Sequence, residues 1–476
     1  MAKFYLTTTL PYVNAEPHIG FALEIIQADV IARYRRSLGD DVVFNFGTDE
    51  HGQKIYEKAL ETGKNPQEYC DEYAAKFEDL KKALNLSYTN FIRTTDAHHK
   101  KAAQEFWKIC LKNGDIYKKN YKVKYCVGCE LEKTDSELVD KKCPLHPKQT
   151  LEIREEENYF FKFSKYQKPL LEFYEKNPDF VVPVSKFNEI KNFVKKGLED
   201  FSISRLKEKM PWGVDVPDDG DHVMYVWFDA LINYISTIGW PTDMKRFNDY
   251  WPVTQFAGKD QVRQQAAMWQ AMLMSANLPS SKQIFIHGFM TVDGEKISKS
   301  LGNTIDPIEV TDKYGTDTLR YYLLAKIHPS EDSDFSWDKF KDVYNADLAN
   351  GLGNLVARVA KLCETTNHKT QSKTKTFKEI SSNEFTNSLS EYKFNEALFL
   401  IWQKITKVDQ YINGEKPWEL VKTDSEKCKN VLAHCVDEIQ EIALLLSPFL
   451  PETSEKITKQ FKGSKITSQP SLFPRI

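Results

Sequence analysis

The sequence predicts an α/β protein whose parallel sheet is split by a metal-binding insertion and followed by an all-helical domain. Apolar runs at residues 4–9, 42–46 and 283–286 predict buried strands, and residues 21–36 carry helical periodicity. Three cysteines and a histidine lie close together within a polar, lysine-rich stretch at about residues 115–221. After about residue 334 the composition shifts to amphipathic helices, which indicates a separate helical domain.

Length and composition limit the class of protein. At 476 residues the chain has room for about three domains, and no run approaches the 18 or so apolar residues that a membrane span needs. The formal net charge is -3, so attraction to a nucleic acid has to come from local patches, such as the four lysines between residues 118 and 124. No paired cysteine framework or signal peptide is evident, and we therefore expect a cytoplasmic location.

His18 and Gly20 lie in the turn between the first predicted strand and the helix that follows it. The helix is indicated by the spacing of Leu23, Ile26 and Val30. A helix N-terminus offers unpaired N–H groups and partial positive charge, and a glycine lets a phosphate or ribose approach the backbone closely. The turn is typical of a nucleotide site, although a plain capping turn with a solvent-facing histidine fits the same residues.

Asp49 follows the apolar run at residues 42–46. This spacing places its carboxylate at the C-terminal edge of a parallel sheet, where such sheets bind ligands. An aspartate that only caps the next segment is the structural alternative.

Two lysines, Lys296 and Lys299, lie on a glycine-bearing loop after the predicted strand at residues 283–286. Ammonium groups three residues apart can fold over a triphosphate and neutralise charge on a departing pyrophosphate. An ordinary solvated Lys/Ser loop would look similar over so short a segment.

Cys126, Cys129, Cys143 and His146 form two close pairs, Cys-x-x-Cys and Cys-x-x-His, separated by thirteen residues. Four soft ligands in this pattern suit tetrahedral zinc with no open position, so we expect one structural Zn²⁺. Unpaired cytosolic thiols are the alternative.

Residues 352–362 carry apolar side chains on one helical face, and residues 431–446 repeat the pattern. Asn354 and Arg358 are four apart, so one helix would present them side by side. Trp418 follows Pro417 directly and is either a packing anchor or an aromatic surface for a base.

Over essentially its whole length the chain resembles the class I aminoacyl-tRNA synthetases, and among them the methionyl-tRNA synthetases of the bacterial form with one zinc knuckle. The resemblance rests on the two signatures at residues 17–20 and 296–300, on the segment at residues 290–303, and on Thr-Leu-Pro-Tyr-Val-Asn, Gly-Thr-Asp-Glu-His-Gly and Tyr-Val-Trp-Phe-Asp-Ala at residues 9–14, 47–52 and 225–230. It implies a Rossmann-type catalytic domain that activates L-methionine with ATP to methionyl-adenylate, releases pyrophosphate, and transfers methionine to the 3′-terminal adenosine of its tRNA.

The resemblance also implies roles for individual residues. It implies catalytic roles for His18, Lys296 and Lys299. It implies ATP contacts for Pro17, Gly20, Gly258, Asp260, His287, Gly288, Met290 and Lys299. It implies methionine contacts for Leu10, Tyr12, Asp49, Trp227, Ala230, Tyr234, Gln265 and Trp269. It implies that Asn354, Arg358 and Trp418 read anticodon bases of initiator and elongator tRNA. Mg²⁺ is expected with the nucleotide, and we expect a monomer that does not bind membranes.

The expected domains follow from these motifs. The catalytic domain comprises residues 1–114 and 222–290, the zinc insertion residues 115–221, the lysine loop and linking segment residues 291–344, and the helical anticodon-binding domain residues 345–476. The chain is too short for a separate editing domain.

Three departures from the family pattern affect the site. Phe21 stands where the first signature often has a second histidine, and Ile297 replaces the usual methionine of the second signature. Gln264 and Gln265 stand where many relatives have an aromatic residue and a histidine, which leaves open the group that contacts the methionine sulfur.

Three other classes of protein share part of this pattern. A cysteine-specific synthetase could be this short, but it would place zinc at the substrate thiol. A related nucleotidyltransferase would have no use for Asn354, Arg358 and Trp418, and a non-catalytic RNA-binding protein would not need Lys296 and Lys299.

Overall fold

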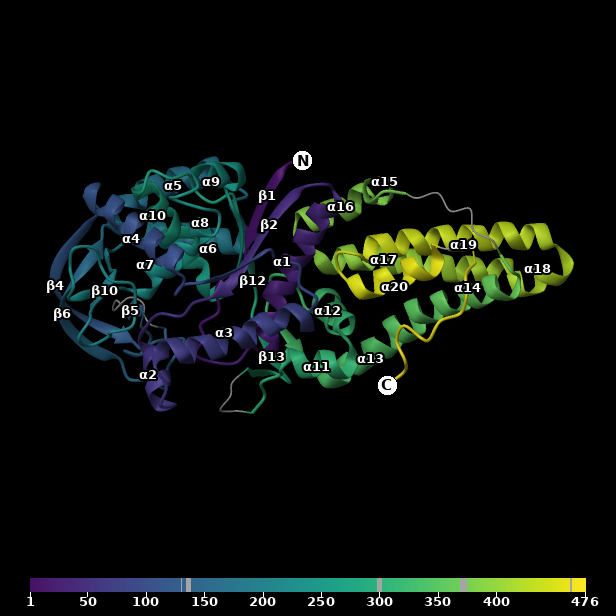
Figure 1. The fold of residues 1–476 in the computed structure, drawn as a ribbon, viewed down its shortest axis with the longest axis horizontal. Helices are drawn as coiled ribbons and strands as arrows, with labels where there is room; N and C mark the ends of the chain where they lie inside the picture. The colour runs from purple at the N-terminus through teal and green to yellow at the C-terminus, as the bar shows by residue number, and fades with distance from the viewer. Residues whose placement is uncertain (130, 134–137, 298–301, 369–374, 463–464) are drawn as a thin grey trace.

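The computed structural model describes residues 1–129, 131–133, 138–297, 302–368, 375–462 and 465–476 (Figure 1). Its central feature is a six-stranded, all-parallel sheet in the order β3-β2-β1-β11-β12-β7. The strands are β1 (Lys3–Thr7), β2 (Asp41–Thr48), β3 (Asn90–Arg93), β7 (Val181–Val182), β11 (Thr254–Gly258) and β12 (Gln283–His287). The predicted parallel α/β sheet is confirmed, and it also includes β7, which lies in the range that we expected to be insertion.

The direction in which strands are added reverses between β1 and β11. From β1 the chain adds β2 and β3 on one side, whereas β11 and then β12 lie on the other side. Leu6 of β1 pairs with Thr254 of β11, so the two strands are direct neighbours. In open parallel sheets such a reversal leaves a crevice beyond the C-terminal strand ends, and ligands bind there.

The side chains of the central strands alternate between two cores. Leu6 and Phe44 point into one core, whereas Tyr5 and Val43 point into the other, as expected for period-2 strands buried on both faces. The surrounding helices are α1 (Ile19–Ser37), α2 (Gln53–Glu61), α3 (Pro66–Ala83), α4 (Ala97–Lys112), α7 (Val226–Ala230), α8 (Asn233–Ser236), α9 (Met244–Tyr250) and α10 (Trp269–Ser275).

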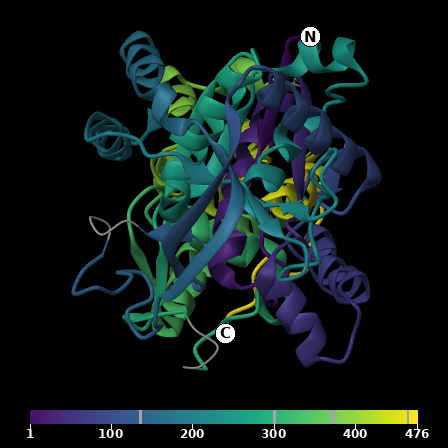
Figure 2. The ribbon, with the colours of Figure 1, turned by 90° about the vertical axis from the view of Figure 1, so that its left-hand side faces the viewer.

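The insertion is built on a separate antiparallel sheet, whose long β4 and β6 strands cross the near face in Figure 2. Lys118 lies 2.7 Å from Asp219, and Lys122 lies 3.6 Å from Glu155 of the neighbouring strand. These lysines are therefore partly neutralised within the protein, which weakens the basic patch suggested by the sequence. The sheet has the order β5-β4-β6-β8, with β4 (Ile116–Cys126), β5 (Leu131–Lys133), β6 (Glu152–Phe161) and β8 (Phe201–Ser202). Helices α5 (Gln167–Lys176) and α6 (Val184–Lys195) follow β6, and β9 (Ser204–Leu206) pairs with β10 (His222–Met224) in a separate two-stranded sheet.

A helical bundle extends away from the sheet (Figure 1). Leu352, Leu355, Val356 and Val359 are buried and Leu362 packs against them, so the predicted apolar face is confirmed. The helices are α14 (Asn354–Thr365), α15 (Phe377–Ile380), α16 (Asn383–Ser390), α17 (Phe394–Glu415), α18 (Pro417–Thr423), α19 (Ser425–Leu446) and α20 (Pro451–Phe461). The segment between sheet and bundle contains β13 (Met290–Val292), β14 (Glu295–Lys296), β15 (Ser333–Phe335), α11 (Pro307–Tyr314), α12 (Thr316–Ala325), α13 (Trp337–Val343) and a π-helix at Tyr344–Gly353.

Arg320 of α12 joins the two parts of the molecule. Its side chain is fully buried and pairs with Asp29 of α1 at 2.9 Å. It also donates to the carbonyl oxygens of Leu84, Pro448 and Phe449, at 3.0, 3.1 and 2.7 Å. One guanidinium thus links α1, the end of α3 and the turn between α19 and α20. Among the described residues, no helix combines the length and apolar character needed to cross a membrane.

Candidate active site

A cavity of about 700 Å³ opens at the C-terminal edge of the sheet, where the strand order reverses. It is lined by residues from the β1–α1 segment, the end of β2, α7 and α8, the segments after β11 and β12, and the cysteine knuckle. The predicted residues that line it are Leu10, Tyr12, His18, Gly20, Asp49, Trp227, Ala230, Tyr234, Gly258, Asp260, Gln265, His287, Gly288, Met290 and Lys296. Pro17 and Trp269 are buried but are not among the lining residues, and Lys299 lies outside the described residues.

His18 is the N-cap of α1. Its Nδ1 accepts a hydrogen bond from the backbone N–H of Gly20 at 3.1 Å. Because Nδ1 is the acceptor, the ring proton is on Nε2. The imidazole therefore stabilises the first turn of the helix and contributes an N–H donor at the cavity wall.

The two signatures meet at the start of α1. A Cβ built on Gly20 would lie 3.6 Å from Cδ1 of Ile297, and the Ile19 N–H donates to the carbonyl of Ile305 at 3.0 Å. The Asn303 side chain donates to the carbonyl of Lys296 at 3.1 Å. Residues on both sides of 298–301 thus lie against the turn that carries His18, and Lys296 lines the same cavity.

Glu24, on the second turn of α1, was missed by the sequence reasoning. Its Oε1 accepts from the Thr9 N–H at 2.8 Å and from the Thr9 hydroxyl at 2.6 Å, and its Oε2 lies 2.8 Å from Nε2 of His287. The other ring nitrogen of His287 lies 2.8 Å from the carbonyl of Gly288. Both ring nitrogens therefore face acceptors, which requires the imidazolium form.

The electrostatics of this wall agree with that assignment. Burial alone would lower the pKa of His287, but the hydrogen bond and charge of Glu24 outweigh it, and the pKa is raised. Burial raises the pKa of the neighbouring Asp260. A cationic histidine beside two carboxyl groups thus forms one side of the cavity.

A second cluster of ionisable groups lies behind the opposite wall. Asp229, on α7 between Trp227 and Ala230, is fully buried and binds Nδ1 of His51 at 2.6 Å and Nε2 of His99 at 2.9 Å. Burial opposes the charge of Asp229, but the two histidines outweigh it and lower the pKa of Asp229 to about 2. Asp229 and His51 lie within the quoted motifs, which gave no role for them, and nothing in the sequence marked His99.

This cluster connects the segments that line the amino-acid side of the cavity. The Tyr12 hydroxyl donates to the carbonyl of His51 at 2.6 Å, and the Asp49 N–H donates to the carbonyl of Pro11 at 2.9 Å. The loop with Tyr12, the end of β2 and helix α7 are therefore held together around one carboxylate.

The residues that depart from the family pattern are buried or packed against neighbouring side chains. Phe21 packs against Phe46 and Phe77, with ring centroids 5.6 and 5.5 Å apart, so it is part of an aromatic cluster. Gln264 and Gln265 are both buried and both line the cavity. The Trp269 ring packs edge-on against the Tyr234 ring, with the ring centroids 5.9 Å apart. Trp269 therefore supports Tyr234, which lines the cavity, from behind.

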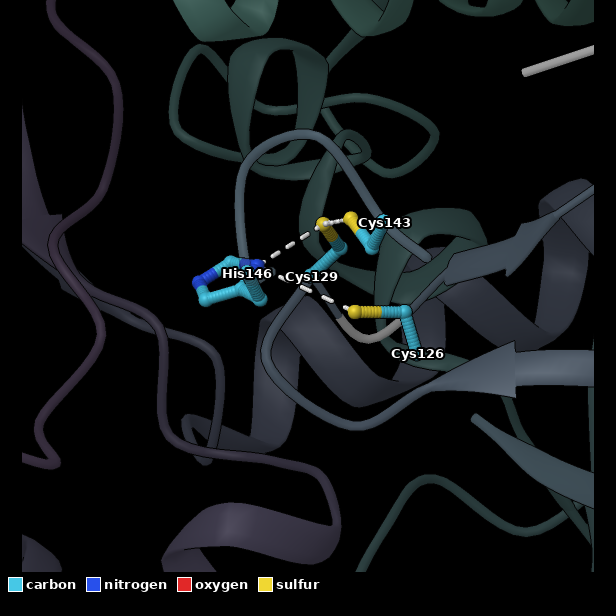
Figure 3. Close-up of side chains that lie close together, drawn as sticks. All are labelled: Cys126, Cys129, Cys143 and His146. Atoms are coloured by element: carbon cyan, nitrogen blue, oxygen red, sulfur yellow. Dashed lines mark hydrogen bonds between the residues drawn. The ribbon is translucent and has the colours of Figure 1, made fainter. Parts of the chain in front are cut away.

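The three cysteines and His146 converge as their spacing predicted (Figure 3). Their ligand atoms all lie within 4.8 Å of one another; Sγ of Cys129 is 3.3 Å from Sγ of Cys143 and 3.2 Å from Nδ1 of His146. A Cβ at Gly128 would meet the His146 ring at 2.4 Å, so the turn requires glycine. Three thiolates and an imidazole at these separations fit a tetrahedral metal site.

The predicted anticodon residues lie in the bundle. Asn354 is exposed at the start of α14, and one turn later Arg358 bonds Asp409 at 2.9 Å and Asn413 at 3.0 Å. Trp418 is 42% exposed on α18.

Comparison with known proteins gives consistent results over the whole chain. The family described as tRNA synthetases class I (M) matches residues 4–151 and 129–360, and the anticodon-binding domain of tRNA ligase matches residues 380–475. A methionine–tRNA ligase from Thermotoga maritima is 44% identical over 96% of this chain and 75% of its own length. One from Rickettsia prowazekii is 40% identical over 97% of this chain and 93% of its own length.

The fold is equally similar to solved structures. Mycobacterium tuberculosis methionyl-tRNA synthetase in complex with methionyl-adenylate superimposes with a TM-score of 0.92 at 35% identity, covering 100% of both chains. The apo form of that enzyme gives 0.85 at 32% identity, covering 100% of this chain and 98% of its own.

Proposed function

This chain belongs to the methionyl-tRNA synthetases of class I, and we propose that its sheet-edge cavity is where L-methionine and ATP react. The enzyme activates methionine with ATP and transfers it to methionine tRNA. The observation that supports this conclusion is that both signatures reach one cavity. His18 and Lys296 line the same cavity as Asp49, Trp227 and Tyr234.

The reaction is an in-line displacement. A methionine carboxylate oxygen attacks the α-phosphorus of ATP, a new P–O bond forms, and the bond to the pyrophosphate oxygen breaks. Nε2–H of His18 and the ammonium group of Lys296 stabilise the charge that develops on the phosphate oxygens, and Lys299 is proposed to assist. No covalent enzyme intermediate is needed because positioning and charge stabilisation suffice.

The proposed substrate contacts divide the cavity into two sides. Asp49 pairs with the methionine ammonium group, while Leu10, Tyr12, Trp227, Ala230, Tyr234 and Gln265 surround the side chain, supported by Trp269. Pro17, Gly20, Gly258, Asp260, His287, Gly288 and Met290 hold the nucleotide. Mg²⁺ bound with ATP would supply further neutralisation of the phosphates.

The functional test is a pyrophosphate-exchange assay across all twenty amino acids. We expect exchange with methionine above every other amino acid. Exchange with cysteine alone would favour a cysteine-specific synthetase, and exchange with none would contradict the activity.

Glu24→Gln is expected to weaken ATP binding selectively. All three partners of Glu24 are donors, so an amide fits only if His287 loses its Nε2 proton and becomes neutral. Losing this charged pair should raise KM for ATP about tenfold while KM for methionine changes little. Steady-state exchange kinetics with each substrate varied in turn measure this effect.

The pH dependence provides the control for that variant. Because the His287 pKa is raised, the imidazolium is present at low pH and is lost as pH rises through its folded value, so ATP affinity of the wild type should fall in that direction. The Gln variant should lack this titration. An unchanged ATP KM and pH profile would remove the Glu24–His287 pair from nucleotide binding.

We also propose that the cysteine cluster holds one structural Zn²⁺ through Cys126, Cys129, Cys143 and His146. The four protein donors leave no open position for a substrate thiol. Gly128 and His146 also line the substrate cavity, and Lys54 of α2 donates to the Gly128 carbonyl at 2.7 Å, so the metal would hold one cavity wall in place.

Cys143→Ser should reduce the zinc content from one per chain to nearly none and lower the thermal midpoint. The measurement is elemental analysis together with a thermal unfolding scan. Cys428→Ser is the control, because its Sγ donates to the Pro417 carbonyl at 3.5 Å and a hydroxyl can replace it. Full zinc retention in the Cys143 variant would contradict the assignment.

The bundle is proposed to bind the tRNA anticodon through Asn354, Arg358 and Trp418, in both initiator and elongator tRNA. The proposed domains are a catalytic domain of residues 1–114 and 222–290, an insertion of residues 115–221 whose strand β7 joins the catalytic sheet, a linking segment of residues 291–344 and a helical domain of residues 345–476. A cytoplasmic, monomeric enzyme fits this role in translation.

A further inference from the structure

His51 is a buried histidine that lies beside the proposed methionine subsite without lining the cavity. Only 2% of its surface is exposed, and its Nδ1 lies 2.6 Å from Oδ2 of Asp229. Asp229 is ionised, since the two histidines beside it outweigh the effect of burial and lower its pKa to about 2. Because an ionised carboxylate can only accept hydrogen bonds, the proton lies on Nδ1 of His51. The pair is therefore a charge-assisted hydrogen bond that is shielded from solvent.

This bond joins the two segments that the proposed function places at opposite ends of methionine. Asp49, the proposed partner of the ammonium group, directly follows β2 and precedes His51 by two residues. Asp229 lies on α7 between Trp227 and Ala230, which are proposed to contact the side chain. Asp49, Trp227 and Ala230 all line the cavity. The distance between the ammonium partner and the side-chain wall therefore depends on how these two segments are held together.

The segment around His51 has further anchors, and they lead to other parts of the fold. The Glu50 carboxylate pairs with Arg93 at the end of β3, at 2.6 Å. The backbone carbonyl of His51 accepts from the hydroxyl of Tyr12, on the segment after β1, at 2.6 Å. Among these three contacts, only the side-chain bond of His51 reaches α7.

We propose that His51 is a positioning residue for the amino-acid subsite: by binding Asp229, it holds Asp49 at the distance from α7 at which one methionine molecule reaches both. This inference rests on the proposed methionine subsite. A ligand gains the full binding energy of two contacts only when their spacing matches its own, and a misplacement of about 1 Å is enough to lose that advantage. His51 thus acts on methionine binding without touching methionine.

The test compares two ligands in the same variant. Methionine uses both ends of the subsite, whereas 4-(methylthio)butanoate has the same side chain and carboxylate but no ammonium group. His51→Leu removes the donor and keeps an apolar side chain beside the Trp212 ring. KM for methionine in pyrophosphate exchange should rise about tenfold, the size of one charge-assisted hydrogen bond. The inhibition constant of the analogue and KM for ATP should change by less than about twofold.

His99→Leu is the matched control. His99 binds the other oxygen of Asp229 at 2.9 Å, so its loss also leaves the buried carboxylate with one histidine, but the bond to His51 remains. Both leucine variants should have a lower thermal midpoint, and only His51→Leu should lose preference for methionine over the analogue. His51→Asn should restore most of that preference, because its amide N–H can donate to Asp229 from near the position of Nδ1.

Adding His51→Leu to Asp49→Asn should cause little further loss of preference, because both changes act on the ammonium contact. An equal rise for both ligands in His51→Leu, an unchanged KM for methionine, or an equal loss of preference in His99→Leu would overturn the inference and leave the proposed function intact.

If His51→Leu does not fold, Asp229→Asn weakens the same bond by removing its charge. This variant should give the same selective rise in KM for methionine, by about threefold. No selective rise would again overturn the inference. A wild-type protein without methionine-dependent exchange would contradict the proposed function itself.

Discussion

His18→Ala is expected to lower kcat/KM for methionine activation about 100-fold, the usual effect of removing one preorganised donor from a developing oxyanion. The imidazole lines the cavity, and its Nε2 carries the proton because Nδ1 accepts from the Gly20 N–H. The same substitution removes the cap of α1, which costs about 1 kcal/mol of stability. Pyrophosphate exchange and thermal unfolding should therefore both change.

His18→Asn separates the two roles. Asparagine is a good N-cap and can accept from the Gly20 N–H, but it has no donor at the position of Nε2. We expect the stability of this variant to be close to that of the wild type, while its kcat/KM falls by the same factor of about 100 as in His18→Ala. If this variant were within threefold of wild type in exchange, the histidine would be a capping residue and another group would stabilise the transition state.

Asp49→Asn should raise KM for methionine about 100-fold, because removing one partner of a buried charge pair typically costs about 2–5 kcal/mol. Asp49 is 4% exposed at the end of β2, where little water reaches it to compensate. KM for ATP should change little, since the nucleotide contacts lie on the opposite side of the cavity. Exchange kinetics with each substrate varied give both constants.

An inhibitor without the amino group provides a sharper version of this test. The wild type should bind methionine far better than 4-(methylthio)butanoate, and Asp49→Asn should lose most of that preference. Asp41→Asn is the matched control, since Asp41 lies at the other end of the same strand and pairs with Lys3 at 2.5 Å. An unchanged preference in the Asp49 variant would assign the ammonium group to a different partner.

The residues that sequence reasoning could find are those with a local signal. Asp49 follows β2 directly, and His18 and Gly20 lie where the segment after β1 enters α1, so a few neighbouring residues are enough to predict their positions. The four ligands of the knuckle are also local, because their spacing alone determines their convergence.

The residues that it missed depend on contacts between distant segments. Glu24 meets His287 across 263 positions, and His99 meets Asp229 across 130. The hydrophobic periodicity of a helix does not reveal which distant residue pairs with a carboxylate on it. The two-residue strand β7 was likewise too short for periodicity, and the lysines of β4 could not be paired with the acidic residues facing them before the strand partners were known.

The buried guanidinium of Arg320 has a mechanical consequence. It links Asp29, which lies two to three turns into the helix that His18 caps, to the turn between α19 and α20. A bundle that moved independently of the sheet would have to break this buried ion pair and these hydrogen bonds together. A displacement of the bundle would therefore also move α1, whose N-cap is His18.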